Sequence, residues 1–336
     1  MKKTAILLIN VGTPDKPDVK HVRKYLSQFL NDKYVIDLPW LLRKLLVNII
    51  IVPFRAPKSS KMYQELWTKN GSPLLNHLNG LTHKLQKKLS DNYLVMGAMH
   101  YGNPTVKSAL EKIKTENIEN IIVVPLYPQY ATSTTESAKK YVLKIIKSCG
   151  IKAEVGFIEQ FYNEPSFVEA FTEQIKSYQP ESYDHIVFSY HGLPVNQVQN
   201  IHPENKYSAC NCENEFPEHG KRCYKATCYE TSRLLAQKLS LPKEKYTVAF
   251  QSRLSNNWLE PFTDKILLEL LKQGKKKVLV AAPSFVADCL ETSYEIVVEY
   301  KKLFLNNGGK ELVLVESLND NETWVNSLIQ IIKKSI

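Results

Sequence analysis

Short apolar runs recur along the chain, and charged stretches with the period of amphipathic helices separate them. Each run is bounded by turn residues and has the length of a buried strand. Parallel strands are covered on both faces and joined by helical crossovers, so this rhythm predicts an α/β fold with parallel sheets. The predicted strands are residues 5–9, 94–99, 121–124, 153–157, 185–189, 247–250, 278–280 and 312–315.

The second half of the chain repeats the plan of the first. Residues 6–14 (ILLINVGTP) resemble residues 186–194 (IVFSYHGLP), and residues 123–128 (VVPLYP) loosely resemble residues 280–285 (VAAPSF). We therefore expect two similar doubly wound units. Folds of this kind bind ligands at the carboxyl ends of their strands, so both units are expected to face a common cleft.

The boundary between the two units carries no Gly/Ser-rich or Pro-rich linker, so only the strand pattern places it. We expect one domain in residues 1–150 and the other in residues 151–316. Residues 197–228 interrupt the second domain, because they are rich in Asn, Glu, Lys and Cys and have little apolar periodicity. Such a segment is typical of an insertion that carries a local site.

The chain is basic, with 44 Lys and Arg against 34 Asp and Glu and a formal net charge of +10. An excess of this sign favours anionic partners, among them nucleic acid, acidic lipid and small molecules with carboxylates. The basic residues are scattered and form no recognition helix or RNA-binding signature, so the sequence disfavours nucleic acid.

No segment of the sequence has the pattern of a targeting or membrane-spanning helix. The apolar run near the N-terminus is too short for a signal peptide, which predicts a cytoplasmic protein. Residues 41–54 are the most apolar longer segment, but Arg43, Lys44, Asn48 and Pro53 interrupt them. Spanning a bilayer takes about 20 apolar residues, so this segment is predicted not to cross one.

A histidine stands at the end of one predicted strand. His191 follows the strand at 185–189 within Ser-Tyr-His-Gly-Leu-Pro, so its imidazole is expected at the strand tip and in the cleft. Imidazole suits proton abstraction or metal ligation near neutral pH. A histidine that only bonds to a carbonyl of the turn fits the pattern as well.

Three glutamates follow the strand at 278–280 at intervals of four. Glu291, Glu295 and Glu299 would lie on one face of a helix. A ridge of carboxylates that enters a cleft can bind a divalent cation or relay protons. Asp288 and Glu291 also have the spacing of a helix capping box, which would explain these two residues without any function.

Basic, hydroxyl and aromatic residues follow the apolar segment at 41–54. Hydroxyl and cationic groups beside aromatic rings could hold the carboxylates of a flat aromatic ligand, while the apolar segment covers its rings. A solvated helix face with buried aromatic residues would give the same pattern. The residues concerned are Arg55, Lys58, Tyr63, Trp67 and Ser72.

Four of the six cysteines fall in the insertion, at Cys210, Cys212, Cys223 and Cys228. Disulfides are disfavoured in the cytosol, and four thiolates suit either a structural zinc ion or an iron–sulfur cluster. Zinc ribbons have paired C-x2-C knuckles that are missing here, which favours an iron–sulfur cluster. The remaining pair, Cys149 and Cys289, is expected to consist of buried thiols.

Taken together, these segments resemble the ferrochelatase family over nearly the whole chain. The matching motifs occur in the same order along the sequence, which makes the resemblance specific although each motif alone is modest. They are LLINVGTP (7–14), RAPK (55–58), GSPL (71–74), AMHYGNP (98–104), PLYPQYATSTT (125–135), SYHGLP (189–194), FQSRL (250–254) and DCLET (288–292).

The resemblance implies two flavodoxin-like (Rossmann-like) domains around a porphyrin cleft, with the last helix, in residues 317–336, packing back on the first domain. It also implies insertion of ferrous iron into protoporphyrin IX to form protohaem. His191 and Glu291 would face each other across the cleft as the catalytic pair and contact the iron, with Glu295 and Glu299 continuing an acidic path.

The resemblance further implies contacts with the porphyrin, with a membrane surface and with an iron–sulfur cluster. An apolar lip at residues 38–54 would rest on a membrane surface, and the cysteine insertion would hold a [2Fe–2S] cluster. His100 stands where Arg is common in the family. The implied porphyrin contacts are Arg55, Lys58, Tyr63, Ser72, His100, Tyr127, Tyr130, Ser252 and Trp258.

Three rival functions remain open at the level of sequence. A chelatase that places cobalt or nickel in another tetrapyrrole would share the fold and the pairing of histidine with carboxylate. A porphyrin carrier would need the basic and aromatic patch but not His191 and Glu291. An interaction protein of the same fold would need only a structural zinc ion on its cysteines.

Overall fold

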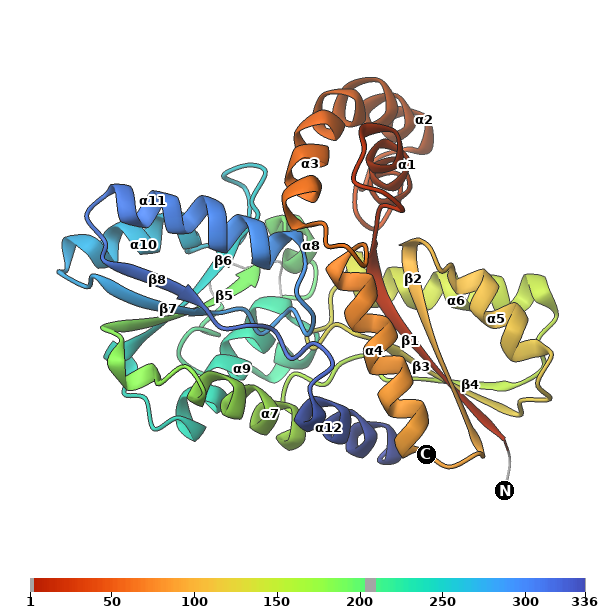
Figure 1. The fold of residues 1–336 in the computed structure, drawn as a ribbon. Helices are drawn as coiled ribbons and strands as arrows, with labels where there is room; N and C mark the ends of the chain where they lie inside the picture. The colour runs from red at the N-terminus through yellow and green to blue at the C-terminus, as the bar shows by residue number, and fades with distance from the viewer. Residues whose placement is uncertain (1–2, 203–209, 336) are drawn as a thin grey trace.

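Two four-stranded parallel sheets form the framework of the computed structural model, which describes residues 3–202 and 210–335 (Figure 1). The first sheet has the order β2-β1-β3-β4, and the second has the matching order β6-β5-β7-β8. All of the predicted strands are present. They are β1 (Thr4–Thr13), β2 (Tyr93–Gly102), β3 (Asn120–Pro125), β4 (Glu154–Phe157), β5 (His185–His191), β6 (Tyr246–Gln251), β7 (Lys277–Ala281) and β8 (Glu311–Leu314).

Strand β1 shows why the apolar runs predicted parallel strands. Ala5, Leu7 and Ile9 point to one face of the sheet and pack with α5 and α6, while Ile6 and Leu8 point to the opposite face. All five side chains are fully buried. A strand covered on both faces needs a continuous apolar run rather than an alternating one.

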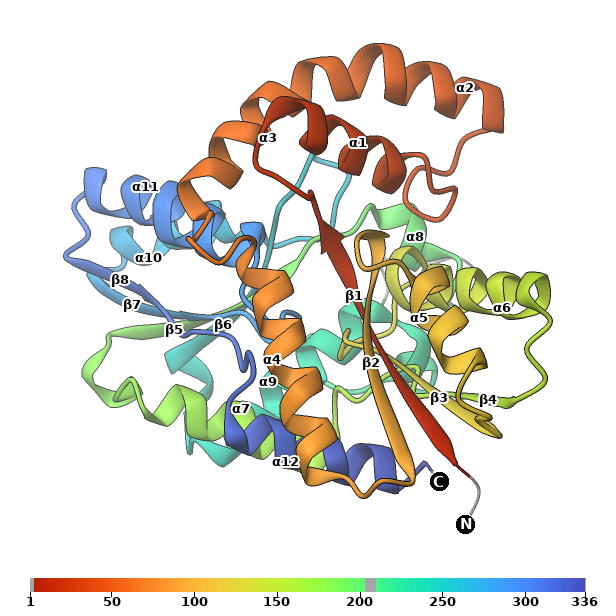
Figure 2. The same ribbon diagram turned by 45° about the vertical axis from the view of Figure 1, so that its right-hand side comes forward.

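Helices cover both faces of each sheet, and a further group stands above the end of β1. In the first half α4 lies on one face of the sheet and α5 and α6 on the other. At the top of Figure 2, α1, α3 and the π-helix that follows α2 form a separate apolar cluster, with α2 beside them. The helices are α1 (Val19–Leu30), α2 (Trp40–Leu45), α3 (Val52–Leu66), α4 (Pro73–Lys88), α5 (Val106–Lys114) and α6 (Ser137–Cys149).

The second half repeats the layered arrangement. Its sheet packs on one face against α7 and α9 and on the other against α10 and α11. The α-helices are α7 (Pro165–Lys176), α8 (Val195–Gln199), α9 (Tyr224–Lys238), α10 (Thr263–Lys272), α11 (Lys301–Asn306) and α12 (Glu322–Lys333). Short 3-10 helices span Pro180–Ser182, Glu218–Arg222 and Lys243–Lys245, and π-helices span Leu46–Ile51, Thr132–Glu136 and Glu291–Tyr300.

The two halves share one continuous hydrophobic core. Strand β4 belongs to the first sheet although it begins after residue 150, so the change of sheet lies between β4 and β5. Helix α12 packs against both α7 and α4. On the α4 side, Lys84 pairs with Asp320 at 2.9 Å and Lys88 pairs with Glu322 at 2.5 Å. The last helix therefore joins the two halves.

Candidate active site

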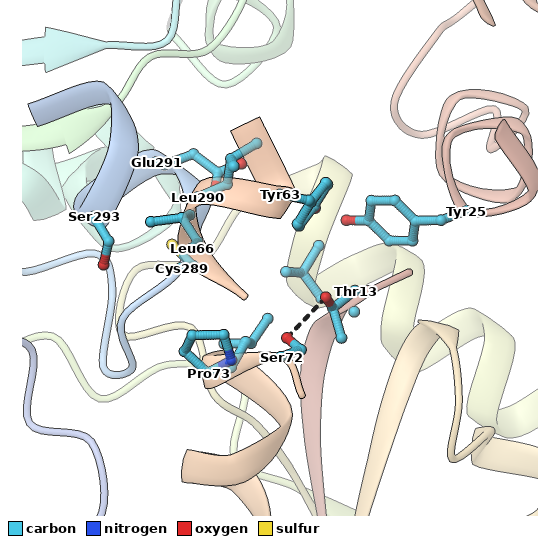
Figure 3. A pocket seen from close by; sticks show the side chains of 13 residues that line it. Thr13, Tyr25, Tyr63, Leu66, Ser72, Pro73, Cys289, Leu290, Glu291 and Ser293 are labelled. Carbon is cyan, nitrogen blue, oxygen red and sulfur yellow. Dashed lines mark hydrogen bonds between the residues drawn. The ribbon is translucent and has the colours of Figure 1, made fainter. Parts of the chain in front are cut away.

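The carboxyl end of β1 opens into a pocket between the two halves (Figure 3). Thr13 comes from β1, Tyr25 from α1, Tyr63 from α3 and Ser72 from the start of α4, while Glu291 comes from the second half. The Ser72 hydroxyl donates to Thr13 Oγ1 at 2.9 Å. The structure thus brings Tyr63, Ser72 and Glu291 together around one pocket.

The two pocket tyrosines meet edge to face. The rings of Tyr25 and Tyr63 are 6.3 Å apart at an interplanar angle of 90°. Burial raises the pKa of both hydroxyls, and the carboxylate of Glu291 adds to the rise. The hydroxyls therefore stay protonated, and the pair offers flat apolar faces with neutral polar tips.

His191 ends strand β5, as predicted, and hydrogen bonds fix it on several sides. Its main-chain N–H donates to Ser284 Oγ at 3.2 Å, and its carbonyl accepts from the Tyr224 hydroxyl at 2.9 Å. Its ring lies between the rings of Trp258 and Phe285, at centroid separations of 6.3 and 6.2 Å. Trp258, one of the implied porphyrin contacts, is thus a neighbour of the histidine.

The orientation of the His191 imidazole leaves its Nε2 atom to accept a proton or bind a metal. Nδ1 of His191 lies 2.6 Å from the carbonyl oxygen of Gly192. Only a protonated Nδ1 can donate to this carbonyl, so the neutral ring carries its lone pair on Nε2. The sequence left open that His191 only bonds to a carbonyl of the turn, and this bond is present. It does not exclude a function, because it sets the tautomer that a base or metal ligand needs.

The side chain of Gln251 links this strand end to the glutamate helix. Its Oε1 accepts from the Ser189 hydroxyl at 2.7 Å, and its Nε2 donates to the carbonyl of Glu291 at 2.7 Å. Its own carbonyl accepts from the N–H of Gly192 at 2.8 Å. Only 1% of Gln251 is exposed. The main chain of Gln251 therefore holds Gly192, the residue after His191, and its side-chain amide holds Glu291 at the start of the π-helix.

Glu291 does not take part in a capping box. The N–H of Asp288, which the box would pair with Glu291, donates instead to Asn319 Oδ1 at 2.9 Å. The carboxylate of Asp288 accepts from Asn319 Nδ2 at 2.8 Å and from the N–H of Ser317 at 3.2 Å. Asp288 is thus tied to the segment that follows β8, and Glu291 lines the pocket.

The other two glutamates have different surroundings. Glu295 accepts hydrogen bonds from the N–H of Ser252 at 2.7 Å, from the Ser252 hydroxyl and from the hydroxyl of Tyr300. Glu299 lies at the surface. Partial desolvation by the neighbouring protein raises the pKa of its carboxyl, although the charge of Lys58 opposes the rise. The three carboxylates therefore run from the pocket to the surface along Glu291–Tyr300, and Ser252 holds the middle one.

Comparisons with known proteins assign this arrangement to a family. Residues 3–336 match the family model described as Ferrochelatase. The chain is 42% identical to a ferrochelatase of Coxiella burnetii (strain Dugway 5J108-111), covering 99% of this chain and 94% of that protein. It is 40% identical to a ferrochelatase of Legionella pneumophila (strain Paris), covering 99% of this chain and 100% of that protein.

The chain belongs to the ferrochelatase family. Ferrochelatases are metal chelatases that insert iron into a porphyrin in the last step of haem formation, and this is the activity of the chain.

Solved structures support the fold. SirB from Bacillus subtilis with Fe³⁺ matches with a TM-score of 0.56 at 13% identity, covering 99% of this chain and 95% of that chain. The sirohydrochlorin chelatase SirB in complex with cobalt matches with the same score at 11% identity, covering 99% and 95%.

The basic residues of this ferrochelatase lie on α3 but face different groups. Arg55 is half-buried, and its charge acts on the hydroxyl of Tyr25 in the pocket. Lys58 is exposed, and its charge acts on Glu299 at the outer end of the glutamate series. Arg55 thus acts on a pocket tyrosine and Lys58 on an outer glutamate, and a porphyrin contact by either stays a prediction.

His100 is buried in the first half. Its ring stacks on Tyr101 at 4.2 Å and on Tyr141 at 5.5 Å, and its Nε2 lies 3.9 Å from Asp32 Oδ2. Burial lowers the pKa of His100 to about 4, although the nearby Asp32 carboxylate opposes the shift. His100 is thus neutral at physiological pH, and its contact with a porphyrin stays a prediction.

Tyr127 and Tyr130 are buried beyond the end of β3. The hydroxyl of Tyr130 donates to Glu136 Oε2 at 3.1 Å, and the guanidinium of Arg222 lies 5.4 Å from its ring. Burial raises the pKa of Tyr130 to about 12. Both tyrosines are neutral and 9% exposed, and their contact with a porphyrin stays a prediction.

The four cysteines of the insertion converge as free thiols. Cys212 interacts electrostatically with Cys210 and Cys223, and Cys228 interacts with Cys212 and Cys223. Burial raises the pKa of Cys223 to about 11 and raises the pKa of Cys212 and Cys228 as well. Buried thiols ionise when a cation is bound to them, so the donors fit a metal centre.

The remaining two cysteines differ from the expectation. Cys149 and Cys289 are half-buried rather than buried. Cys149 is the last residue of α6. Cys289 lines the pocket together with Glu291.

The lip predicted at residues 38–54 is a strongly apolar surface. Trp40 is 66% exposed and Phe54 is 80% exposed. Arg43 turns inward instead, donating to the carbonyls of Asn31 at 2.9 Å and Leu38 at 2.6 Å. The other exposed apolar residues of the lip are Leu38, Leu41, Leu42, Leu45, Ile49 and Ile50. In the described ranges 3–202 and 210–335, no helix is both long and apolar enough to cross a membrane.

Sequence reasoning missed two residues that complete the site. Tyr25 lines the pocket from α1, and Gln251 joins β5 to the π-helix. Gln251 lies within the quoted motif FQSRL, where a polar residue ends a strand, so the motif offered a signal. Tyr25 occurs at a periodic apolar position of a helix and offered none.

Proposed function

We propose that this ferrochelatase inserts ferrous iron into protoporphyrin IX with His191 and Glu291 as the catalytic pair. The observation that carries the proposal is that Gln251 connects the segments of the two residues. Its side-chain amide donates to the carbonyl of Glu291, and its main-chain carbonyl accepts from Gly192, the residue after His191. The aromatic faces of Tyr25 and Tyr63 beside Glu291 support a flat ligand in the pocket.

Metal insertion removes two protons from pyrrole nitrogens as four nitrogens bind one Fe²⁺. The lone pair on Nε2 of His191 accepts a pyrrole proton, because Nδ1 is committed to the carbonyl of Gly192. Glu291 carries protons away or guides the ferrous ion, since carboxylate and imidazole bind ferrous iron without the strong retention of thiolates. Glu295, held by Ser252 and Tyr300, supplies a fixed carboxylate behind Glu291.

Anaerobic turnover with protoporphyrin and ferrous iron tests the catalytic pair. In Glu291→Ala and His191→Ala we expect haem formation to fall by roughly 10²-fold to 10⁴-fold, the range for loss of a proton-transfer group. Porphyrin binding should change little. Glu65→Ala is the matched control, because Glu65 is an exposed carboxylate on α3. Full turnover in either variant would remove that residue from the mechanism, and a wild type that binds porphyrin without forming haem would overturn the assignment.

The choice of protoporphyrin over coproporphyrin rests on the lip. The exposed apolar surface around Trp40 and Phe54 suits the ring with fewer carboxylates. Competition between the two porphyrins in the same assay measures the preference. A higher kcat/KM for coproporphyrin would contradict the choice.

We further propose that the protein works in the cytoplasm with its lip against the inner face of a membrane. A contiguous apolar patch on a helical pair is typical of helices that lie in a bilayer interface. The net charge of +10 adds an attraction to anionic lipid.

We also propose that the insertion holds a resident metal centre. Either the four thiols of Cys210, Cys212, Cys223 and Cys228 hold a [2Fe–2S] cluster, or thiols of this group bind a structural zinc ion. A cluster would give a brown protein with charge-transfer bands, whereas zinc would leave it colourless, so the visible absorption spectrum distinguishes the two.

A further inference from the structure

Two histidines stand beside the cysteines of the insertion. His202 follows α8 and is 5% exposed, and His219 lies in the 3-10 helix Glu218–Arg222. Their rings are 4.8 Å apart and meet edge to face. One potential ligand atom from each of His202, Cys210 and His219 lies within 4.8 Å of the other two. The insertion therefore offers imidazole as well as thiolate donors.

Two nitrogen–sulfur distances among these residues match the separation of two ligands on a tetrahedral metal ion, and Cys223 lies beside His202 but outside the group of three donors. Nε2 of His219 lies 3.6 Å from Sγ of Cys210, and Nε2 of His202 lies 3.5 Å from Sγ of Cys223. With Zn–S near 2.3 Å and Zn–N near 2.05 Å, two ligands of a tetrahedral zinc ion are about 3.6 Å apart. Two separate nitrogen–sulfur pairs already have this spacing.

Local hydrogen bonds prepare His202 and Cys223 for a cation. Nδ1 of His202 lies 2.9 Å from the carbonyl of Val198, which fixes the protonated nitrogen and turns Nε2 towards Cys223. Cys223 precedes α9, and its sulfur accepts from the N–H of Ala226 at 3.5 Å. A helix N-terminus favours the thiolate form that binds a metal.

The charges nearby favour a neutral centre. Lys225 pairs with Glu213 at 2.6 Å, and Arg233, whose guanidinium donates to the carbonyl of Cys212, pairs with Glu230 at 2.8 Å. Each of these two cations is paired with a carboxylate, although the charge of Lys225 also acts on the thiols of Cys212 and Cys223. A zinc ion with two thiolates and two imidazoles is neutral, whereas four thiolates would leave a buried double negative charge that is costly to desolvate.

We propose that the insertion binds one zinc ion through His202, Cys210, His219 and Cys223. The inference rests on the metal centre proposed above and changes its donor set, with two imidazoles in place of two thiolates. Cys212 and Cys228 then remain buried thiols beside the centre, and the ion fixes the insertion without taking part in iron insertion.

X-ray absorption on the purified wild type, produced in medium that supplies both zinc and iron, tests the donor set without any variant. We expect one zinc ion per chain with two sulfur neighbours near 2.3 Å and two nitrogen neighbours at about 2.0–2.1 Å. Zinc with four sulfur neighbours, or an iron–iron vector, would overturn the histidine ligands while supporting a metal centre. A protein that retains no metal would overturn both proposals.

Metal retention in variants gives a second measurement. His202→Ala and His219→Ala should weaken zinc binding by at least about 10–100-fold, because even partners outside the ligand set have effects of that size. Cys212→Ser should keep the zinc ion, and so should the control His83→Ala, an exposed histidine on α4. Loss of zinc in Cys212→Ser with retention in His202→Ala would contradict the assignment.

Discussion

The buried amide of Gln251 donates to the main-chain carbonyl of Glu291 across 2.7 Å. The same side chain accepts from Ser189, two residues before His191 on β5. The proposed proton acceptor and the proposed carboxylate come from segments far apart in the sequence, and this amide connects the main chain of one segment to a residue on the strand that bears the other.

Replacing Gln251 by Leu should therefore affect stability and catalysis together. The hydroxyl of Ser189 and the carbonyl of Glu291 would lose their partner, so we expect the free energy of unfolding to fall by about 1–3 kcal/mol. As a positioning residue, Gln251 should lower kcat more than it changes KM for porphyrin. Denaturant unfolding and anaerobic kinetics measure the two effects.

Gln330→Leu is the control for this change, because Gln330 is exposed on α12. It should leave both quantities within error. A Gln251→Leu protein with lowered stability but unchanged kcat would limit the role of Gln251 to folding.

The close approach of β2 to the end of β1 predicts a large effect at Gly12. Its φ is +122°, and a Cβ there would lie 1.8 Å from the carbonyl oxygen of Tyr101. Gly12→Ala should lower the free energy of unfolding by more than about 2 kcal/mol and distort the pocket wall that Gly12 shares with Thr13. Gly156→Ala in β4 has no atom within 4 Å of the new Cβ and should be close to neutral. Equal effects at the two positions would refute the steric argument.

Acid should destabilise the protein through its buried histidines. Burial lowers the pKa of His100 to about 4, whereas an unfolded histidine titrates near 6.5. Below pH 6.5 the unfolded state binds a proton that the folded state does not, so the stability is present above pH 6.5 and is lost as the pH falls towards 4. The loss is at most about 3 kcal/mol.

The difference between wild type and His100→Gln isolates this contribution, because His185, whose pKa burial also lowers to about 4, titrates in both proteins. Unfolding free energies between pH 7 and pH 4 should fall more steeply in the wild type. Parallel curves would show that His100 does not set the slope.

The lip should bind lipid through its exposed side chains. Sedimentation with vesicles that contain anionic lipid should recover the wild type, and the double variant Trp40→Ser, Phe54→Ser should bind at least about tenfold more weakly, because each lost apolar contact is worth on the order of 1.5–3 kcal/mol. Leu254→Ser is the control, since Leu254 is 67% exposed outside the lip. Equal binding by both variants would contradict the membrane contact.

The sequence predicted the strands well because parallel strands are buried on both faces, and their apolar runs are visible without any tertiary information. The position of His191 followed from the end of one such run. The bonds of Gln251 and the approach of His202 to Cys223 depend on segments far apart in the chain, so no local pattern reveals them. The fourfold spacing of the glutamates also could not distinguish an α-helix from the π-helix Glu291–Tyr300.

Helix α12 lies at the opposite end of β1 from α1, α2 and α3, as Figures 1 and 2 show, and it packs on both α4 and α7. Its contacts with the two halves include the fully buried Trp324, Val325 and Leu328. Rotation of one sheet against the other would have to pull these side chains into water. The packing of α12 therefore opposes any change in the spacing of the two sheets.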